Sequence, residues 1–264
     1  MTVTDRAYYS KSLGAKRPHF HDCHQVILIT GGSAEFTING RVSPAGAGDA
    51  VILSRFENHS VKILSDSYLR YILHVDPDDG SHDGSICQFL ANRPAGFENI
   101  IKVGDDTPRL ARLFERIIAE DGGERLASQM RQLLINELII EIYRHTPPHI
   151  GFELYEDREI YELQLRLERD YDKSHTLSFL AKQYSMSVSS LAHKFKKVTG
   201  SSVMDYLLSC RMAQAKRLLV STALSVDEVV SRCGFSDSSN FCRSFKAQTG
   251  LTPSAFRKEY KKGL

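Results

Sequence analysis

The first third of the chain alternates short apolar runs with turn residues. Asn39-Gly40 is a strong signal for a two-residue hairpin, and Pro44–Gly48 reads as a further turn. The apolar runs between such turns are Gln25–Thr30, Ala34–Ile38, Ala50–Leu53, Val61–Leu64 and Leu69–Val75. This pattern predicts several short strands that form a small barrel or sandwich.

From residue 107 to residue 145 the apolar period changes to that of a helix. One predicted helix buries Leu110, Leu113, Phe114, Ile117 and Ile118. After a break at Gly122-Gly123, a second helix has a face made of Met130, Leu133, Leu134, Leu138 and Ile142. Ile135, Ile139 and Ile140 make this second helix apolar around most of its circumference, so we expect it to be buried, in part against a second copy of the chain.

The region after residue 157 is helical throughout and contains an internal repeat. A shift of 50 positions aligns Phe195-Lys196 with Phe245-Lys246 and Thr199-Gly200 with Thr249-Gly250. Each copy predicts a short helix, a tight turn and a second helix: Leu177–Tyr184 with Val188–Val198, then Val226–Arg232 with Ser238–Gln248. A helix at about Met204–Leu219 joins the two copies.

Each copy has the layout of a helix-turn-helix. Ser187 is a good N-cap for the second helix of the first copy, and Asp237 or Ser236 for that of the second copy. Leu191 and Phe195, and likewise Phe241 and Phe245, lie four residues apart and should face the core. The opposite side of each second helix would then be exposed, and a helix of this size fits the DNA major groove.

Charge is unevenly divided along the chain. Residues 174–264 carry 14 Lys/Arg against 5 Asp/Glu, a net charge of +9, whereas residues 1–173 carry 20 against 27, a net charge of −7. A basic domain beside an acidic one is typical of a protein that meets a polyanion. The residues expected to contact phosphates are Lys194, Lys196, Lys197, Arg211, Lys216, Arg217, Lys246, Arg257 and Lys258.

The stretch 177–260 resembles the DNA-binding domain of AraC-family transcription regulators. The resemblance rests mainly on the segments GFSDSSNF, RSFK and GLTP of the second copy. It implies two helix-turn-helix units that insert into successive major-groove segments of double-stranded DNA. By position, the base-reading residues would be Ser189, Ala192 and His193 in the first unit and Ser238, Ser239, Asn240 and Arg243 in the second. Arg243 suits guanine and Asn240 suits adenine, whereas His193 stands where many members have arginine.

Histidines cluster in the predicted strand region. His19, His21 and His24, followed later by His59, resemble the histidine-bearing motifs of the cupin half of AraC-type regulators. The resemblance implies a site for a small polar effector, with candidate residues His19, His21, His24, Gln25, Glu35, Arg55 and His59. In metal-binding cupins a glutamate ligand stands near the position of Gln25, and glutamine is a poor ligand. We therefore expect no metal or other cofactor, although His19, His21 and His59 alone would still form a three-histidine set.

Together these patterns predict a multidomain α+β protein. The expected parts are a cupin-like effector-binding β-barrel at 1–106, a helical dimerisation segment at 107–146, a linker at 147–156 and an AraC-type double helix-turn-helix domain at 157–264. The expected function is that of a homodimeric, effector-controlled transcription regulator that is not an enzyme. Two alternatives stay open: a cupin-type metal-dependent enzyme with a helical appendage, and a DNA-binding dimer that responds to no effector.

Composition fits this picture. An apolar fraction of 42% and a charged fraction of 25% are those of an ordinary globular protein. No stretch approaches the roughly 18 apolar residues of a membrane helix, and the first residues lack the apolar segment of a signal peptide. The five cysteines form no C-x-x-C pair. We read them as free thiols of a cytoplasmic protein that has no membrane partner.

Overall fold

The computed structural model describes residues 5–14, 16–77, 89–91, 99–122, 125–146 and 158–260. The chain divides into two compact units, residues 2–158 and residues 159–264, each of which is described here by itself. The predicted linker, residues 147–156, lies outside the described residues.

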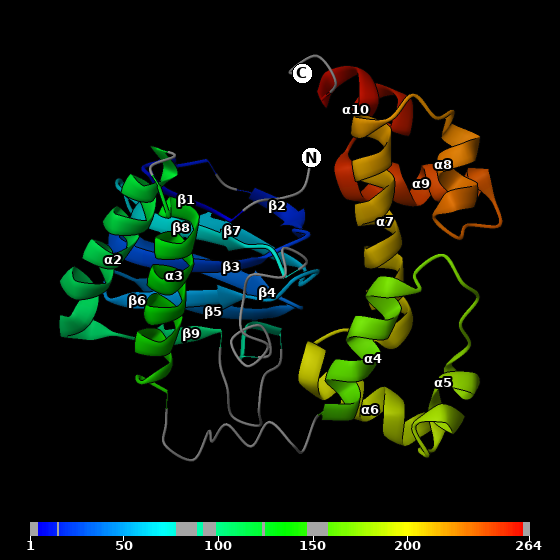
Figure 1. Ribbon diagram of the computed structural model, residues 1–264, viewed down its shortest axis with the longest axis horizontal. Coiled ribbons are helices and arrows are strands. Elements are labelled where there is room, and N and C mark those ends of the chain that lie inside the picture. The colour runs from blue at the N-terminus through cyan, green and yellow to red at the C-terminus, as the bar shows by residue number, and fades with distance from the viewer. Residues whose placement is uncertain are drawn as a thin grey trace. The chain divides into compact units, whose positions relative to one another are not determined.

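Two antiparallel sheets form the body of the N-terminal unit (Figure 1). The five-stranded sheet has the order β1-β8-β3-β6-β9 and the four-stranded sheet the order β2-β7-β4-β5. The strands are β1 (Arg6–Ser10), β2 (Lys16–His19), β3 (His24–Gly31), β4 (Ser33–Ile38), β5 (Arg41–Gly46), β6 (Asp49–Leu53), β7 (His59–Ile63), β8 (Leu69–Val75) and β9 (Ile100–Lys102).

The predicted hairpin between β4 and β5 is confirmed. Asn39 and Gly40 both have positive φ angles, 49° and 83°, as a tight two-residue hairpin turn requires. The turn predicted at Pro44–Gly48 is wrong in its first half, because β5 continues to Gly46. Proline is tolerated there because β5 is an edge strand of its sheet.

The central strands β3 and β6 are buried on both faces, which explains their unbroken apolar runs. On β3, Ile27 and Ile29 point between the two sheets, whereas Val26 and Leu28 point to the outer face of the five-stranded sheet. Successive side chains of a strand alternate between its faces. One strand therefore contributes to two layers of core.

Helices α2 (Thr107–Ala119) and α3 (Ala127–Tyr143) cover that outer face (Figure 1). The short 3-10 turns η1 (Gly104–Asp106) and η2 (Glu120–Gly122) precede and follow α2. Leu134, Leu138 and Ile142 of α3 are buried against the sheet, as predicted. Met130 and Leu133 are instead 42% and 64% exposed, because they lie on the side of α3 that faces away from the sheet.

The C-terminal unit is entirely helical where the structure describes it. It contains α4 (Arg158–Arg169), α5 (Leu177–Gln183), α6 (Val188–Thr199), α7 (Val203–Ser221), α8 (Val226–Arg232), α9 (Ser238–Thr249) and α10 (Pro253–Tyr260). A β-sheet unit thus precedes an all-helical unit, as the sequence predicted.

Candidate functional site

Helices α5 and α6 form the first helix-turn-helix. The Ser187 hydroxyl accepts a hydrogen bond from the backbone N–H of Ser190 at 3.1 Å and so caps α6, as predicted. Leu191 and Phe195 are fully buried. The core therefore fixes which side of α6 is exposed.

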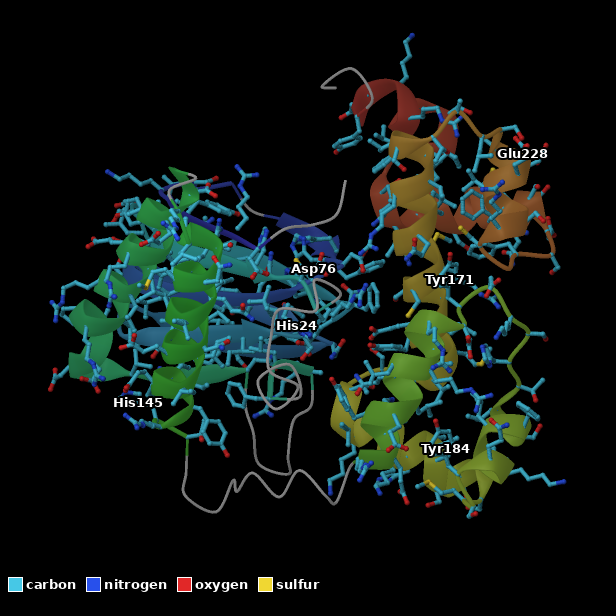
Figure 2. All side chains as sticks on the ribbon, viewed as in Figure 1. His24, Asp76, His145, Tyr171, Tyr184 and Glu228 are labelled. Carbon is cyan, nitrogen blue, oxygen red and sulfur yellow. The ribbon has the colours of Figure 1, made fainter. Side chains whose placement is uncertain are left out.

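Helices α8 and α9 repeat this arrangement with stronger caps. The Asp237 carboxylate accepts from the N–H groups of Ser239 at 2.7 Å and Asn240 at 3.1 Å. At the start of α8, Ser225 and Glu228 form a reciprocal capping box. Figure 2 shows Glu228 on the outside of this helix. Hydrogen bonds from Ser225 hold the pKa of the Glu228 carboxyl below its usual value.

The turn between α8 and α9 depends on Gly234. Its φ is +73°, and a Cβ atom added there would lie 2.5 Å from the backbone oxygen of Asp172. A side chain would therefore meet both backbone strain and a backbone clash. The turn fixes the position of α9 against the segment that follows α4.

The seven predicted base-reading residues lie in the first half of α6 and α9. Ser189, His193, Ser239, Asn240 and Arg243 are exposed, and Ala192 and Ser238 are half-buried. The Ser238 hydroxyl donates to a carboxylate oxygen of Asp227 at 2.8 Å. The arrangement presents hydrogen-bonding groups at the N-terminal half of each helix, the part that meets base edges in a major groove.

The nine predicted phosphate contacts separate into groups. Lys196, Lys197, Lys246 and Lys258 are exposed, and Lys216 and Arg217 are half-buried. The Lys194 ammonium lies 3.1 Å from a Glu159 carboxylate oxygen.

Arg211 and Arg257 have evident structural roles. The Arg211 guanidinium donates to the carbonyl oxygens of Tyr171 at 2.7 Å and Lys173 at 2.9 Å. Arg257 donates to the carbonyl oxygen of Leu219 at 3.0 Å and to that of Leu224. These bonds tie α7 to the segment after α4 and α10 to the end of α7.

A small pocket of about 100 Å³ lies in the N-terminal unit. Four of the seven predicted effector residues line it: His19, His21, Gln25 and His59. Sequence reasoning missed four other polar lining residues, Tyr8, Tyr68, Arg70 and His74.

The other three predicted effector residues do not line this pocket. His24 precedes Gln25 in β3 and so points to the opposite face, where its Nδ1 accepts from the Arg55 N–H at 3.0 Å. The buried Arg55 guanidinium pairs with Asp22 at 2.8 Å. Glu35 alternates in the same way with Phe36, which does line the pocket.

Three histidines meet at one side of the pocket. One ring nitrogen from each of His19, His21 and His59 lies within 4.8 Å of the others. His59 Nδ1 lies 2.9 Å from the Glu57 carbonyl oxygen. Because a carbonyl oxygen only accepts, Nδ1 is the donor, and in the neutral ring Nε2 carries the lone pair. The Gln25 amide nitrogen donates to His74 Nε2 at 2.7 Å.

The pocket lining also includes apolar side chains, tyrosines and one guanidinium. Burial raises the pKa of Tyr68 to about 12 and lowers that of Arg70. The Arg70 guanidinium stacks 4.4 Å from the Tyr68 ring centre and donates to the Ser12 carbonyl at 3.1 Å. Tyr68 thus stays a neutral phenol, and the pocket combines imidazoles, phenols and one guanidinium.

Comparison with known protein families matches residues 180–259 to a helix-turn-helix domain and residues 12–143 to an AraC-like ligand binding domain. The second match alone spans half of the chain. The chain belongs to the AraC family of transcription regulators. It combines the DNA-binding and ligand-binding domains of that family, and the helix-turn-helix units and the pocket described above lie within these two matched regions.

Known AraC-family relatives extend over most of the chain. The HTH-type transcriptional activator RhaS of Salmonella typhimurium is 24% identical over 247 residues, which cover 90% of this chain and 86% of RhaS. RhaS of Enterobacter sp. strain 638 is 24% identical over 242 residues, with the same coverage.

Solved structures share the fold. ToxT from Vibrio cholerae, crystallised with an unsaturated fatty acid, is 14% identical with a TM-score of 0.61, covering 98% of this chain and 96% of ToxT. A second ToxT structure is 10% identical with a TM-score of 0.62, covering 97% and 99%. Among the residues that the structure describes, no helix is long and apolar enough to cross a membrane.

Proposed function

We propose that this regulator reads a bipartite operator with α6 and α9 in successive major-groove segments on one face of the DNA. The observation that carries this proposal is the pair of N-capped helices, each anchored by buried residues on one side and exposed on the other. Helix α7 joins them. Two short DNA boxes about one helical turn apart would suit this arrangement.

Base recognition is assigned to the exposed first halves of the two helices. Arg243 is placed to bind guanine through two hydrogen bonds, and Asn240 is placed to bind adenine in the same way. The first unit offers Ser189, Ala192 and His193, whose side chains are shorter or lack the arginine fork. We therefore expect the box read by α9 to be the more sharply defined one.

Control of DNA binding is assigned to the pocket of the N-terminal unit. A small polar effector in this pocket could bind more tightly when the DNA-binding units are in one arrangement than in another. It would then shift the population toward the arrangement to which it binds more tightly. Histidines, phenols and Arg70 are suitable partners for such a ligand. We place this regulator in the cytoplasm, where the DNA is accessible.

A homodimer is the oligomeric state that α3 supports. Leu126, Met130, Leu133 and Ile140 are 62%, 42%, 64% and 45% exposed. Leu126 directly precedes α3, and the spacing of three and seven residues places Met130, Leu133 and Ile140 on one side of the helix. A second copy of α3 would cover this apolar stripe and bring two DNA-binding units together.

Selection from a pool of random-sequence duplexes at a stated salt concentration tests the proposal. Since the chain contains no tryptophan, labelled DNA provides the readout. Enrichment of two boxes about one helical turn apart is expected. Salt-sensitive binding without enrichment would contradict base reading by the effector-free chain. It would mean either that specific binding requires the effector or that the cupin half carries the activity.

A further inference from the structure

The sequence led us to expect no metal, because Gln25 stands near the position where metal-binding cupins have a glutamate ligand. From the geometry of the three histidines we nevertheless propose that His19, His21 and His59 bind a first-row transition-metal dication, with Zn²⁺ as the reference ion. The proposal extends the function above, because it assigns a chemical class to a ligand of the same pocket. Only its regulatory consequence rests on that function. Metal binding itself needs nothing but the N-terminal unit.

The strand pairing brings the three imidazoles together from two separate segments. His19 of β2 and His59 of β7 are direct partners in the antiparallel register. His21 follows β2, and its carbonyl accepts the Phe56 N–H at 2.9 Å, which ties this segment to the loop before β7. The ring centres lie 4.4 Å apart for His19 and His59, 4.8 Å for His19 and His21, and 5.3 Å for His21 and His59.

The separations between the three ring nitrogens are close to those that one metal ion needs. Zinc binds histidine nitrogen at about 2.0–2.1 Å, so two nitrogens on one tetrahedral ion lie about 3.4 Å apart. The three nitrogens already lie within 4.8 Å of one another. Small ring rotations about the side-chain torsions of the two half-buried histidines, His19 and His21, would close the remaining gap.

The surroundings of His59 favour a ligand role over a merely packed histidine. Its Nδ1–H donates to the Glu57 carbonyl at 2.9 Å, which fixes the ring and places the lone pair on Nε2. A backbone carbonyl in this position is one of the usual outer partners of a metal-bound histidine. His74 differs, because its Nε2 accepts from the Gln25 amide at 2.7 Å, so we assign it a supporting position.

The pocket has a volume of about 100 Å³ and is partly open, so it has room for an ion together with a further ligand. Three histidines leave a coordination position for water or an anion, as in three-histidine zinc sites. Arg70 is the charged residue of the lining, and its guanidinium would favour an anionic fourth ligand such as hydroxide or chloride.

The direct test titrates the metal-stripped full chain with ZnCl₂ by isothermal calorimetry. Elemental analysis of the dialysed complex then gives the stoichiometry. We expect one equivalent of zinc, with affinity at least about tenfold weaker in His21→Ala and His59→Ala. Visible absorption of the Co²⁺ form should show nitrogen and oxygen ligation without a thiolate band.

His145→Ala is the matched control. This histidine follows α3 and pairs with Asp106 at 3.0 Å, and Figure 2 shows it well apart from His24. Its removal should leave zinc affinity unchanged. His59 is buried, so thermal unfolding checks that each variant folds, and the half-buried His21→Ala keeps the test valid if His59→Ala does not fold.

Two results would overturn the site: no zinc binding up to about 1 mM, or equal affinity in wild type, His21→Ala and His59→Ala. Operator selection is a separate experiment. If the histidines do not bind zinc but an operator is enriched, only this inference is rejected. Zinc bound through the histidines without an enriched operator would contradict only the base reading proposed for the effector-free chain.

The regulatory consequence has its own measurement. Saturating Zn²⁺ should change the affinity of the wild-type chain for its selected operator and leave that of His21→Ala unchanged. Equal responses in both proteins would show that the metal does not act through this site.

Discussion

Arg243 and Lys196 are both exposed cations on the second helices of the helix-turn-helix units, α9 and α6, yet we expect them to act on DNA in different ways. Arg243→Ala should cost about 1–3 kcal/mol on the preferred operator and relax the preference at one base pair. Lys196→Ala should weaken binding to all DNA sequences similarly. It should also reduce the slope of log affinity against log salt concentration by about one unit. Binding to a set of single-base operator variants separates the two effects. A uniform loss for Arg243→Ala would contradict its base-reading role.

Glu228 makes the start of α8 sensitive to acid. Its folded pKa lies below the unfolded value, so its contribution to stability is present above about pH 4.5 and is lost as pH falls through the folded pKa. Glu228→Gln should keep the cap near neutral pH and flatten the acid limb of the unfolding free energy. Urea unfolding followed by circular dichroism at several pH values measures this slope. Glu259→Gln, an exposed carboxylate of α10, is the control, and equal slopes in both variants would refute the assignment.

Among the structural elements, the turn before α9 has a natural comparison within the chain. Gly234 and Gly250 have φ angles of +73° and +77°, but only at Gly234 would a Cβ meet a backbone atom, at 2.5 Å. Gly250→Ala should cost about 1–2 kcal/mol from backbone strain. Gly234→Ala should cost more, because α9 must also move away from Asp172. Urea unfolding of both variants measures their unfolding free energies. Equal losses of free energy would mean that the contact between the new Cβ and Asp172 is relieved without cost.

The proposed dimer interface on the exposed apolar side of α3 can be tested by introducing a charged side chain. Leu133→Glu adds a carboxylate to a side chain that is 64% exposed in the monomer, so the fold should tolerate it. Dimer dissociation should become at least about tenfold easier, because a charge would be buried at the interface. Val42→Glu, 55% exposed on the edge strand β5, is the matched control. Sedimentation equilibrium distinguishes the outcomes, and an unchanged dimer would remove α3 from the interface.

Sequence alone identified the elements whose signals are local. Strands β3 and β6 were predicted from their apolar runs, and helices α6 and α9 from Ser187, Asp237 and the 50-residue repeat. The second half of strand β5 was missed because Pro44 and Gly46 read as a turn. Proline's missing N–H is harmless only at a sheet edge, and edge position is not visible in a sequence.

The pocket was half predictable for a similar reason. His19, His21, Gln25 and His59 come from recognisable motifs, but Arg70 and His74 enter only because β8 pairs with β3 and places His74 opposite Gln25. A weak signal existed in the alternation of Arg70, Ile72 and His74 along one strand face. Which face meets the other sheet depends on strand order, and no local pattern specifies that.

At the scale of the whole molecule, the basic charge of the C-terminal unit should appear in the salt dependence of DNA binding. The exposed lysines Lys196, Lys197, Lys246 and Lys258 predict a slope of about −4 or steeper in a plot of log affinity against log salt. A slope near zero would contradict phosphate binding by these lysines. Arg211→Ala should leave the slope unchanged and lower the unfolding free energy, because two backbone carbonyls lose their donor.

Helix α7 sets a length in the C-terminal unit that the operator must accommodate. Its 19 residues span about 28 Å without a break. Phe195 packs against Tyr206 near one end, and Arg257 binds the Leu219 carbonyl near the other. One base pair inserted between the two boxes turns the second box by about 36°, and no loop within α7 allows the protein to follow. The DNA must then twist or bend instead, so the flexibility of the untouched spacer becomes part of the recognition code.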